Sequence, residues 1–209
     1  YSGIEVVVCG TTGDTLIGSG AHETLDGYDG ADLLVGGGGN DSLFGGIGDD
    51  TLTGDEGDDT LNVWDGADWA LGGAGNDLII GGAGPQYLDG GDGVDTVDLS
   101  RAGPLNVWFS GAVGDHTVVG AEWVVGSAQG DTLYDDVGTD QVLIGGGGGD
   151  RLDGGLGNDT ADYGDSTLSV SATLYITGSA VRADGTDTLI GIENLSGGGG
   201  NDFLQGSDG

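Results

Sequence analysis

The chain has 209 residues, of which 51 are glycine, and its 36 acidic residues against three arginines give a formal charge of −33. Such a composition favours disorder unless a repeating pattern imposes order and a cation neutralises the charge. Three arginines and no lysine exclude an electrostatic nucleic-acid interface. No apolar run approaches a membrane span, and the single cysteine, Cys9, excludes an internal disulfide.

A nine-residue period runs from Cys9 to Asp98. It is clearest in GGGGNDSLF, GGIGDDTLT and GDEGDDTLN, which occupy residues 36–62. We number the positions of each unit one to nine: glycine tends to occupy one, two and four, aspartate six, and a large aliphatic residue eight. In each unit the apolar residue at position eight points inward and its two neighbours point outward, which predicts a very short strand. The Gly/Asp-rich residues before it predict a turn. Units this small must stack on one another to fold.

Two units can close one flattened coil of eighteen residues, which predicts an all-β, parallel β-roll. Position eight then supplies a single ladder of core residues: Leu16, Leu25, Leu34, Leu43, Leu52, Leu61, Ala70, Ile79, Leu88 and Val97. Only Ala70 lacks bulk. Since so thin a core does not offset the conformational entropy of ordering the chain, a further stabilising agent is expected.

Two more conventional strand-rich stretches interrupt the roll, and we interpret them as β-hairpin-like excursions. The predicted order is a return element at 1–8, a first roll at 9–98, an excursion at 99–125, a second roll at 126–162 with one extra residue near 135–144, a second excursion at 163–196, and the start of a third roll at 197–209. The return element GIEVVV at 3–8 and the new repeat at 197 suggest a segment of a longer protein.

Position six concentrates the candidate chemistry, because a period of eighteen stacks its side chains along two edges. One row is Asp14, Asp32, Asp50, Asp68 and Gln86, and the other is Glu23, Asp41, Asp59, Asp77 and Asp95. Bare carboxylates at strand spacing repel, whereas a divalent cation between them converts repulsion into attraction. Carboxylates and glycine-rich main chain offer only oxygen ligands, which favours Ca²⁺ over zinc or magnesium.

These motifs resemble the RTX, or haemolysin-type, calcium-binding repeats of bacterial secreted proteins. The resemblance implies calcium between position-six carboxylates of successive coils, with carbonyls at two and four of one coil and at one and three of the next. It assigns three sites in full: Gly37, Gly39 and Asp41 with Gly54, Glu56 and Asp59; Asp55, Gly57 and Asp59 with Gly72, Ala74 and Asp77; and Gly46, Gly48 and Asp50 with Val63, Asp65 and Asp68.

Departures from the repeat predict where metal binding weakens. Glu23 is longer than the turn expects and Gln86 carries no charge, so weak or absent metal is expected near each. Later candidate ligands are Asp131 paired with Asp150, Asp140 paired with Asp159, and Asp202 in the third roll.

The unit VWDGADWAL at 63–71 places Trp64 and Trp69 where glycine or threonine is usual. Local repacking around Ala70 is the favoured interpretation, and an aromatic contact for a glycan or a protein is the alternative. The segment starting at His22 resembles HExxH, but Asp26 replaces the second histidine, so no zinc site is expected. Without a Gly-x-Ser-x-Gly elbow or a lysine, we expect no enzyme.

The sequence therefore predicts a structural module that folds on binding several Ca²⁺ ions outside the cell, within a larger secreted or cell-surface protein. The resemblance adds type I secretion. Two alternatives remain: a self-assembling surface-layer, adhesin or filament component, and an accessory domain of a secreted hydrolase, toxin or epimerase. Expected partners are calcium, flanking regions of the longer chain, and either further copies of itself or surface polysaccharide.

Overall fold

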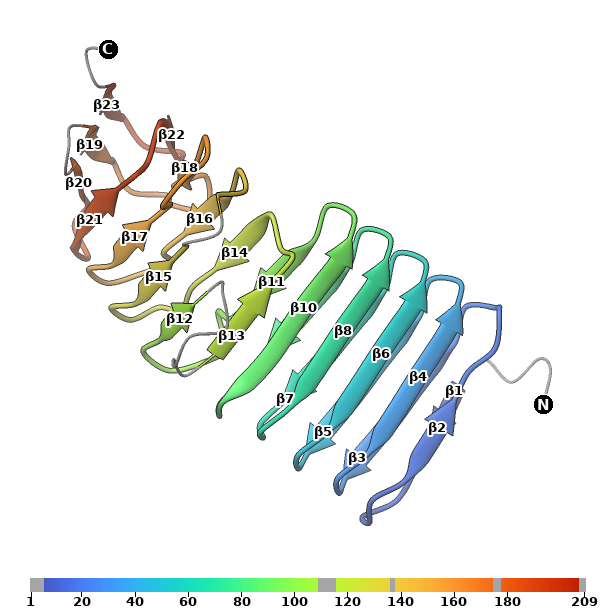
Figure 1. The fold of residues 1–209 in the computed structure, drawn as a ribbon. Coiled ribbons are helices and arrows are strands. Elements are labelled where there is room, and N and C mark those ends of the chain that lie inside the picture. The colour runs from blue at the N-terminus through green and yellow to red at the C-terminus, as the bar shows by residue number, and fades with distance from the viewer. Residues whose placement is uncertain (1–5, 109–115, 136–137, 175–177, 207–209) are drawn as a thin grey trace.

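The computed structural model describes residues 6–108, 116–135, 138–174 and 178–206. Its described strands form two facing sheets that run the length of an elongated molecule, and the chain passes from one sheet to the other at nearly every turn (Figure 1). No helix in these four ranges is long and apolar enough to cross a membrane.

The first sheet contains, in spatial order, β1 (Val6–Val8), β3 (Thr24–Asp29), β5 (Ser42–Ile47), β7 (Thr60–Trp64), β9 (Leu78–Gly81), β11 (Thr96–Asp98), β14 (Trp123–Val125), β16 (Val142–Ile144), β18 (Thr160–Asp162) and β22 (Asn194–Ser196). The second sheet contains β2 (Thr15–Ile17), β4 (Leu33–Gly38), β6 (Thr51–Glu56), β8 (Trp69–Ala74), β10 (Gln86–Asp92), β13 (His116–Val119), β12 (Asn106–Trp108), β15 (Thr132–Tyr134), β17 (Arg151–Asp153), β21 (Thr186–Ile190), β20 (Gly178–Val181), β19 (Ser171–Thr173) and β23 (Phe203–Gln205).

The strands of the first roll pair in parallel with a register of eighteen residues. Leu34 lies beside Leu52 in the second sheet, and Leu43 lies beside Leu61 in the first. Each coil therefore contains two nine-residue units, which confirms the predicted parallel β-roll. Most strands between β3 and β10 are longer than predicted, because pairing continues from positions seven to nine into the glycines of the next unit.

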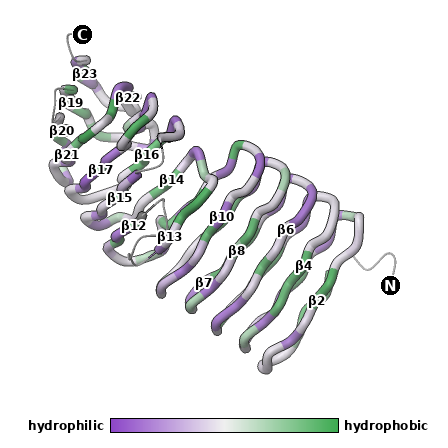
Figure 2. Tube along the Cα trace, in the orientation of Figure 1, coloured by the Kyte–Doolittle hydropathy of each residue, from purple (hydrophilic) through white to green (hydrophobic). Residues whose placement is uncertain are grey.

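Inside the roll, the position-eight side chains form the predicted ladder, and every one of them is buried. Figure 2 shows hydrophobic residues recurring along the strands and hydrophilic residues at the turns. Val63, at a position usually held by glycine, is also fully buried in the unit that contains Ala70. Trp64 and Trp69 are about half exposed, so the prediction that they repack around Ala70 is wrong, and Val63 supplies core volume there instead.

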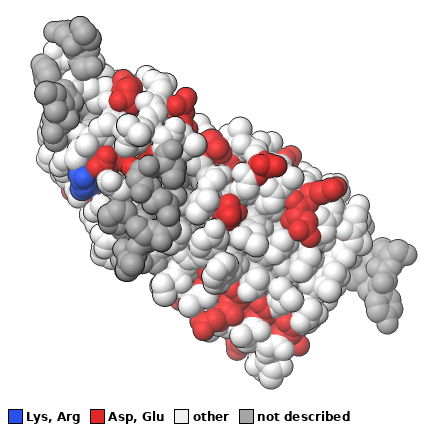
Figure 3. All heavy atoms as spheres, in the orientation of Figure 1, with Lys and Arg blue, Asp and Glu red and all other residues white. Residues whose placement is uncertain are grey.

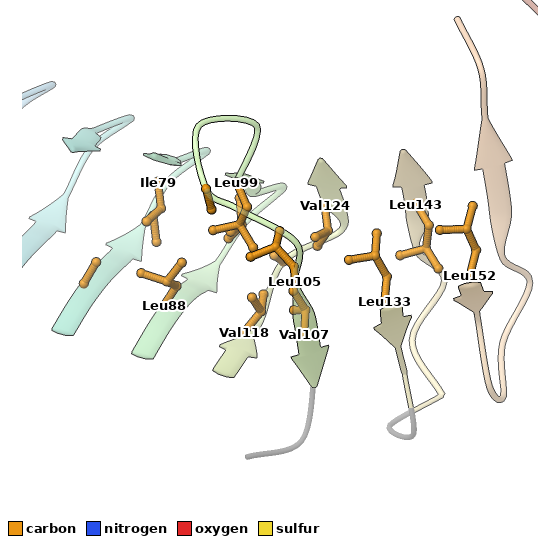
Figure 4. Close-up of a cluster of buried hydrophobic side chains, with 14 of the residues drawn as sticks. Ile79, Leu88, Leu99, Leu105, Val107, Val118, Val124, Leu133, Leu143 and Leu152 are labelled. Atoms are coloured by element: carbon orange, nitrogen blue, oxygen red, sulfur yellow. The ribbon is translucent and has the colours of Figure 1, made fainter. Parts of the chain in front are cut away.

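The first excursion widens the second sheet rather than leaving the stack. β13 pairs with β10, and β12 lies between β13 and β15, all in parallel. This pair is therefore not a hairpin. Its side chains continue the core: Leu105, Val107 and Val118 fill the space between the sheets next to Leu88 and Leu133 (Figure 4).

The second excursion is antiparallel, as a hairpin requires, because β20 pairs antiparallel with both β19 and β21. Between the excursions, β15 pairs with β17 at a register of nineteen residues, Thr132 facing Arg151. β16 and β18 return to eighteen, Val142 facing Thr160. The extra residue thus lies between β15 and β16.

Candidate metal centres

The position-six carboxylates of the first roll lie in two rows at the turns that precede the strands of each sheet. Figure 3 shows acidic side chains gathered near these edges. Despite their charge, most of the aspartates predicted as ligands are buried: Asp32, Asp41, Asp50, Asp59, Asp68, Asp77, Asp95, Asp131, Asp150 and Asp159. Asp14 and Asp202 are partly exposed. A buried charge is costly unless it is paired or bound to a metal, so each carboxylate needs a partner.

One oxygen of each carboxylate links neighbouring coils. Asp41 donates its backbone N–H to Oδ1 of Asp59 at 2.7 Å, and Asp59 donates to Oδ1 of Asp77 at 2.8 Å. In the other row, Asp32 donates to Asp50 and Asp50 to Asp68, both at 2.9 Å. The carboxylate thus replaces a strand carbonyl as acceptor, which explains why the ladder persists through the turn.

The second oxygen behaves differently. Among the aspartates predicted as ligands within the described ranges, Oδ2 is buried without a hydrogen-bond partner in Asp32, Asp41, Asp50, Asp59, Asp77, Asp95 and Asp159. A buried, unpaired carboxylate oxygen costs more than a neutral one, and its repetition at the same position of successive coils indicates a shared missing counter-ion.

Main-chain oxygens converge on the same places. A Cβ on Gly36 would lie 2.4 Å from Oδ2 of Asp41 and 2.9 Å from the carbonyl oxygen of Gly54, in the following coil. A Cβ on Gly57 would lie 1.9 Å from the Gly39 carbonyl, which faces the next coil. Since Gly57 has a φ of 126°, glycine is required there twice over, by conformation and by space.

The second predicted site repeats this arrangement one coil later. A Cβ on Gly54 would lie 2.2 Å from Oδ2 of Asp59 and 2.5 Å from the carbonyl of Gly72. The Asp55 carbonyl points at the next coil in the same way, 2.2 Å from a Cβ on Gly73. The position-three carbonyls of Glu56 and Ala74 accept N–H groups from Gly39 and Gly57, both at 2.8 Å.

The third predicted site, on the opposite edge, offers the same kinds of oxygen ligand as the other two and differs in the residue at position one. The Gly48 carbonyl would lie 1.9 Å from a Cβ on Gly66, and the Asp65 carbonyl accepts the N–H of Gly48 at 3.3 Å. Gly46 precedes Gly48 in the turn, with a φ of 108°. Val63 replaces the usual position-one glycine, and its side chain points into the core.

Burial raises the pKa of these aspartates, and neighbouring carboxylates add to the effect for all of them except Asp131, whereas backbone N–H bonds to the carboxylate oppose it. The pKa is raised to about 6 for Asp59, Asp68, Asp95 and Asp159 and to about 7 for Asp150. It is also raised for Asp41, Asp50, Asp77 and Asp131. Without a cation, the fold therefore disfavours the ionised state that exists at neutral pH.

Glu23 and Gln86, where weak metal binding is expected, have internal partners. Ser19 donates its backbone N–H to Oε2 of Glu23 at 3.2 Å and its hydroxyl to Oε1. The Gln86 amide Nε2 donates to Oδ2 of Asp68 at 2.9 Å and to the Trp64 carbonyl at 2.7 Å. A neutral amide thus takes up the oxygen that the other coils leave unpaired.

The later candidates differ in part from the prediction. Asp131 donates its N–H to Oδ1 of Asp150 at 3.0 Å, as stacking requires. Asp140, however, is exposed, and Gln141 takes the buried position whose N–H donates to Asp159 at 2.8 Å. The row therefore contains Gln141 where we predicted Asp140, because the inserted residue precedes position six and moves the following residues forward by one.

Besides Gln141, three row members escaped the sequence analysis. Asp95 donates its N–H to Oε2 of Glu122 at 2.8 Å, and Asp159 donates to Oε2 of Glu193 at 2.9 Å. Asp150 donates to Oδ1 of Asp187 at 2.9 Å. The return elements carried a usable signal, since each places its glutamate two residues after a glycine, and Asp187-Thr188-Leu189 repeats the Asp-Thr-Leu of the roll at 50–52.

The donor set fits a hard cation held largely by main-chain oxygen. In the described part of the chain no three His, Cys, Asp or Glu side chains are grouped closely enough to hold a metal, so carbonyls must complete each site. Carboxylates and carbonyls in a glycine-rich turn suit Ca²⁺, which accepts six to eight oxygen ligands in flexible geometry. The fold and its turns thus define a β-roll of the calcium-binding class.

Comparison with known families gives the same result. Residues 10–43, 26–61, 35–70, 65–97, 116–143, 142–161 and 187–209 match the RTX calcium-binding nonapeptide repeat. The chain belongs to this family and is a calcium-binding module. A search of curated proteins found no match to the chain.

Proposed function

We propose that the chain is a non-enzymatic structural module, part of a larger secreted or cell-surface protein, which folds when it meets calcium outside the cell. The observation that carries this proposal is the repeated burial of an unpaired Oδ2, as in Asp41, Asp59 and Asp77. A chain with a formal charge of −33 repels itself when it is compact. Calcium acts on both costs, since it pairs the buried oxygens and neutralises the charge.

Calcium binding and folding then form one equilibrium, because the ligands of each site come from two coils and are assembled only when the coils stack. Each site contributes about 3 kcal/mol when free calcium is a hundredfold above its dissociation constant. Extracellular calcium modules have dissociation constants of about 10⁻⁴–10⁻³ M, so cytosolic calcium would leave the chain unfolded, whereas extracellular calcium would fold it.

The test is a far-UV circular dichroism titration with free calcium buffered from the micromolar to the millimolar range, and with magnesium as the control cation. Cooperative gain of β structure near millimolar calcium, and none with magnesium at the same concentration, is expected. Equal β structure in chelator and in calcium would contradict the folding switch. Secretion is tested separately, by locating the full-length protein in cell and medium fractions of its producing organism.

A further inference from the structure

All three arginines lie in the described ranges, and among them Arg182 alone has a buried side chain. Its side chain is 3% exposed, although it stands in the turn between β20 and β21. Arg151, by contrast, has a side chain that is 40% exposed, although its partner Asp153 is buried. Burying a guanidinium is costly without strong partners, so the groups around Arg182 must compensate for its loss of contact with water.

The guanidinium lies between the coils of Asp150 and Asp187, where it contacts two carbonyls and two carboxylates, and its Nε lies 3.7 Å from Oδ1 of Asp184 in its own turn. Nη1 donates to the carbonyl of Gly146, and Nη2 lies 3.5 Å from the carbonyl of Gly148. Nη2 also lies 3.3 Å from Oδ2 of Asp150 and 3.3 Å from Oδ2 of Asp187. The ring of Tyr163 covers the guanidinium carbon at 5.2 Å from its centroid, a favourable arrangement for a cation.

These partners occupy the same repeat positions as the predicted calcium ligands. Gly146, Gly148 and Asp150 hold positions two, four and six of their unit, as Gly37, Gly39 and Asp41 do in theirs. Asp187 belongs to the next coil and accepts the N–H of Asp150, as Asp59 accepts that of Asp41.

We infer that Arg182 is a tethered cation that takes the place of calcium between the coils of Asp150 and Asp187. An ordinary ion pair would need only the two carboxylates, whereas this side chain also contacts the position-two and position-four carbonyls. The inference rests on the proposed function, since it presumes that the equivalent places in the first roll bind calcium.

A second, independent contact follows the same rule. The Gln86 amide Nε2 contacts the position-two carbonyl of Trp64 and Oδ2 of Asp68 in the first roll. The side chains of Arg182 and Gln86 thus each donate to Oδ2 of a position-six aspartate. The same atom is unpaired in Asp41 and Asp59. At these two positions a side chain of the protein itself occupies the expected metal site, and the stacking of the coils there does not depend on calcium.

The sequence separation shows how the second excursion makes this possible. Successive row members of the first roll are eighteen residues apart, whereas Asp150 and Asp187 are 37 apart. Beyond β17 and β18, the intervening chain forms β19 and β20, and the turn after β20 carries Arg182 back into the roll. The backbone N–H of Arg182 donates to the Gly185 carbonyl at 2.9 Å, which holds that turn closed.

The test compares Arg182→Ala with Arg151→Ala, a matched loss of one positive charge at the surface. Bound calcium is counted by equilibrium dialysis in saturating calcium. Stability is measured by thermal unfolding in calcium and in chelator, where a stabilising osmolyte first populates the calcium-free fold. We expect Arg182→Ala to bind one more calcium ion per chain than the wild type and Arg151→Ala to bind the same number. The Arg182→Ala variant should be destabilised in chelator and restored by calcium.

An unchanged calcium count, or a loss of stability that calcium does not restore, would overturn the inference. The wild-type protein gives a second measurement that requires no variant: hydrogen exchange in chelator, with the same osmolyte populating the calcium-free fold. The N–H of Thr188, bonded to the Asp150 carbonyl, should exchange more slowly than that of Leu78, bonded to the Asp59 carbonyl; equal exchange would also overturn it. If the wild type itself binds no calcium, the proposed function fails instead.

Discussion

Substituting Asp59 by asparagine should change stability in opposite directions with and without calcium. Asparagine keeps Oδ1, which accepts the N–H of Asp41 at 2.7 Å, and replaces the unpaired Oδ2 with an amide. The amide cannot ligate calcium as a carboxylate does, but it removes a buried charge. Gln86 shows that an amide is accommodated at position six, since its side chain pairs with Asp68 in the other row.

The magnitudes follow from the site. Burial raises the pKa of Asp59 from 3.8 to about 6, and each pKa unit corresponds to roughly 1.4 kcal/mol. After solvent screening, removing the charge should stabilise the calcium-free fold by about 1–3 kcal/mol at pH 7. In saturating calcium, loss of a site should destabilise the protein by about 3 kcal/mol per site lost, and Asp59 belongs to two predicted sites.

The assay is urea unfolding followed by circular dichroism, in chelator and in calcium, where the calcium-free fold is first populated with a stabilising osmolyte. Asp58→Asn is the matched control, because it removes the same charge from an exposed neighbour. The control should change stability by less than about 1 kcal/mol in both conditions. A change of the same sign for Asp59→Asn in chelator and in calcium would refute the reasoning.

Three further predictions concern protons, the core and the glycines. Burial raises the pKa of Asp59, Asp95 and Asp159 to about 6. The calcium-free fold should therefore gain stability as the pH falls from 7 towards 4, while calcium affinity falls. If the chain in chelator gains no β structure on acidification, this prediction is wrong. Leu34→Ala, at a fully buried ladder position, should cost about 2–5 kcal/mol in thermal melts with calcium, whereas its partly exposed neighbour Leu33→Ala should cost less than about 1 kcal/mol, and equal costs would count against the ladder. Gly54→Ala should cost about 1–3 kcal/mol and lower calcium affinity in calorimetric titrations, because its Cβ would lie 2.2 Å from Oδ2 of Asp59, and retained affinity would show that this space is not part of the site.

The nine-residue period was sufficient to predict the roll because one apolar residue per unit leaves only one way to build a core. The eighteen-residue register and the burial of Leu34 and Leu52 follow directly from it. Stacking of Asp41 on Asp59 follows from the same register. Where the pattern is unbroken, the sequence is an adequate guide to both fold and site.

The pattern is a poorer guide where it breaks, because tertiary contacts then decide which residue takes each place. An inserted residue moves Gln141 rather than Asp140 into the row, and the buried Val63 compensates for Ala70 without help from the neighbouring tryptophans. The place of Arg182 depends on an excursion whose antiparallel pairing returns it to the roll, and no local spacing encodes that contact.

The central claim, that calcium lies between successive coils at the unpaired carboxylate oxygens, is tested most directly by a crystal structure grown with calcium and phased with its anomalous scattering. The account predicts cations about 2.3–2.6 Å from the Oδ2 atoms of Asp41 and Asp59, and none between Asp150 and Asp187, where Arg182 stands. Cations bound only to exposed carboxylates such as Asp58, or a fully formed roll without cations between its coils, would contradict it.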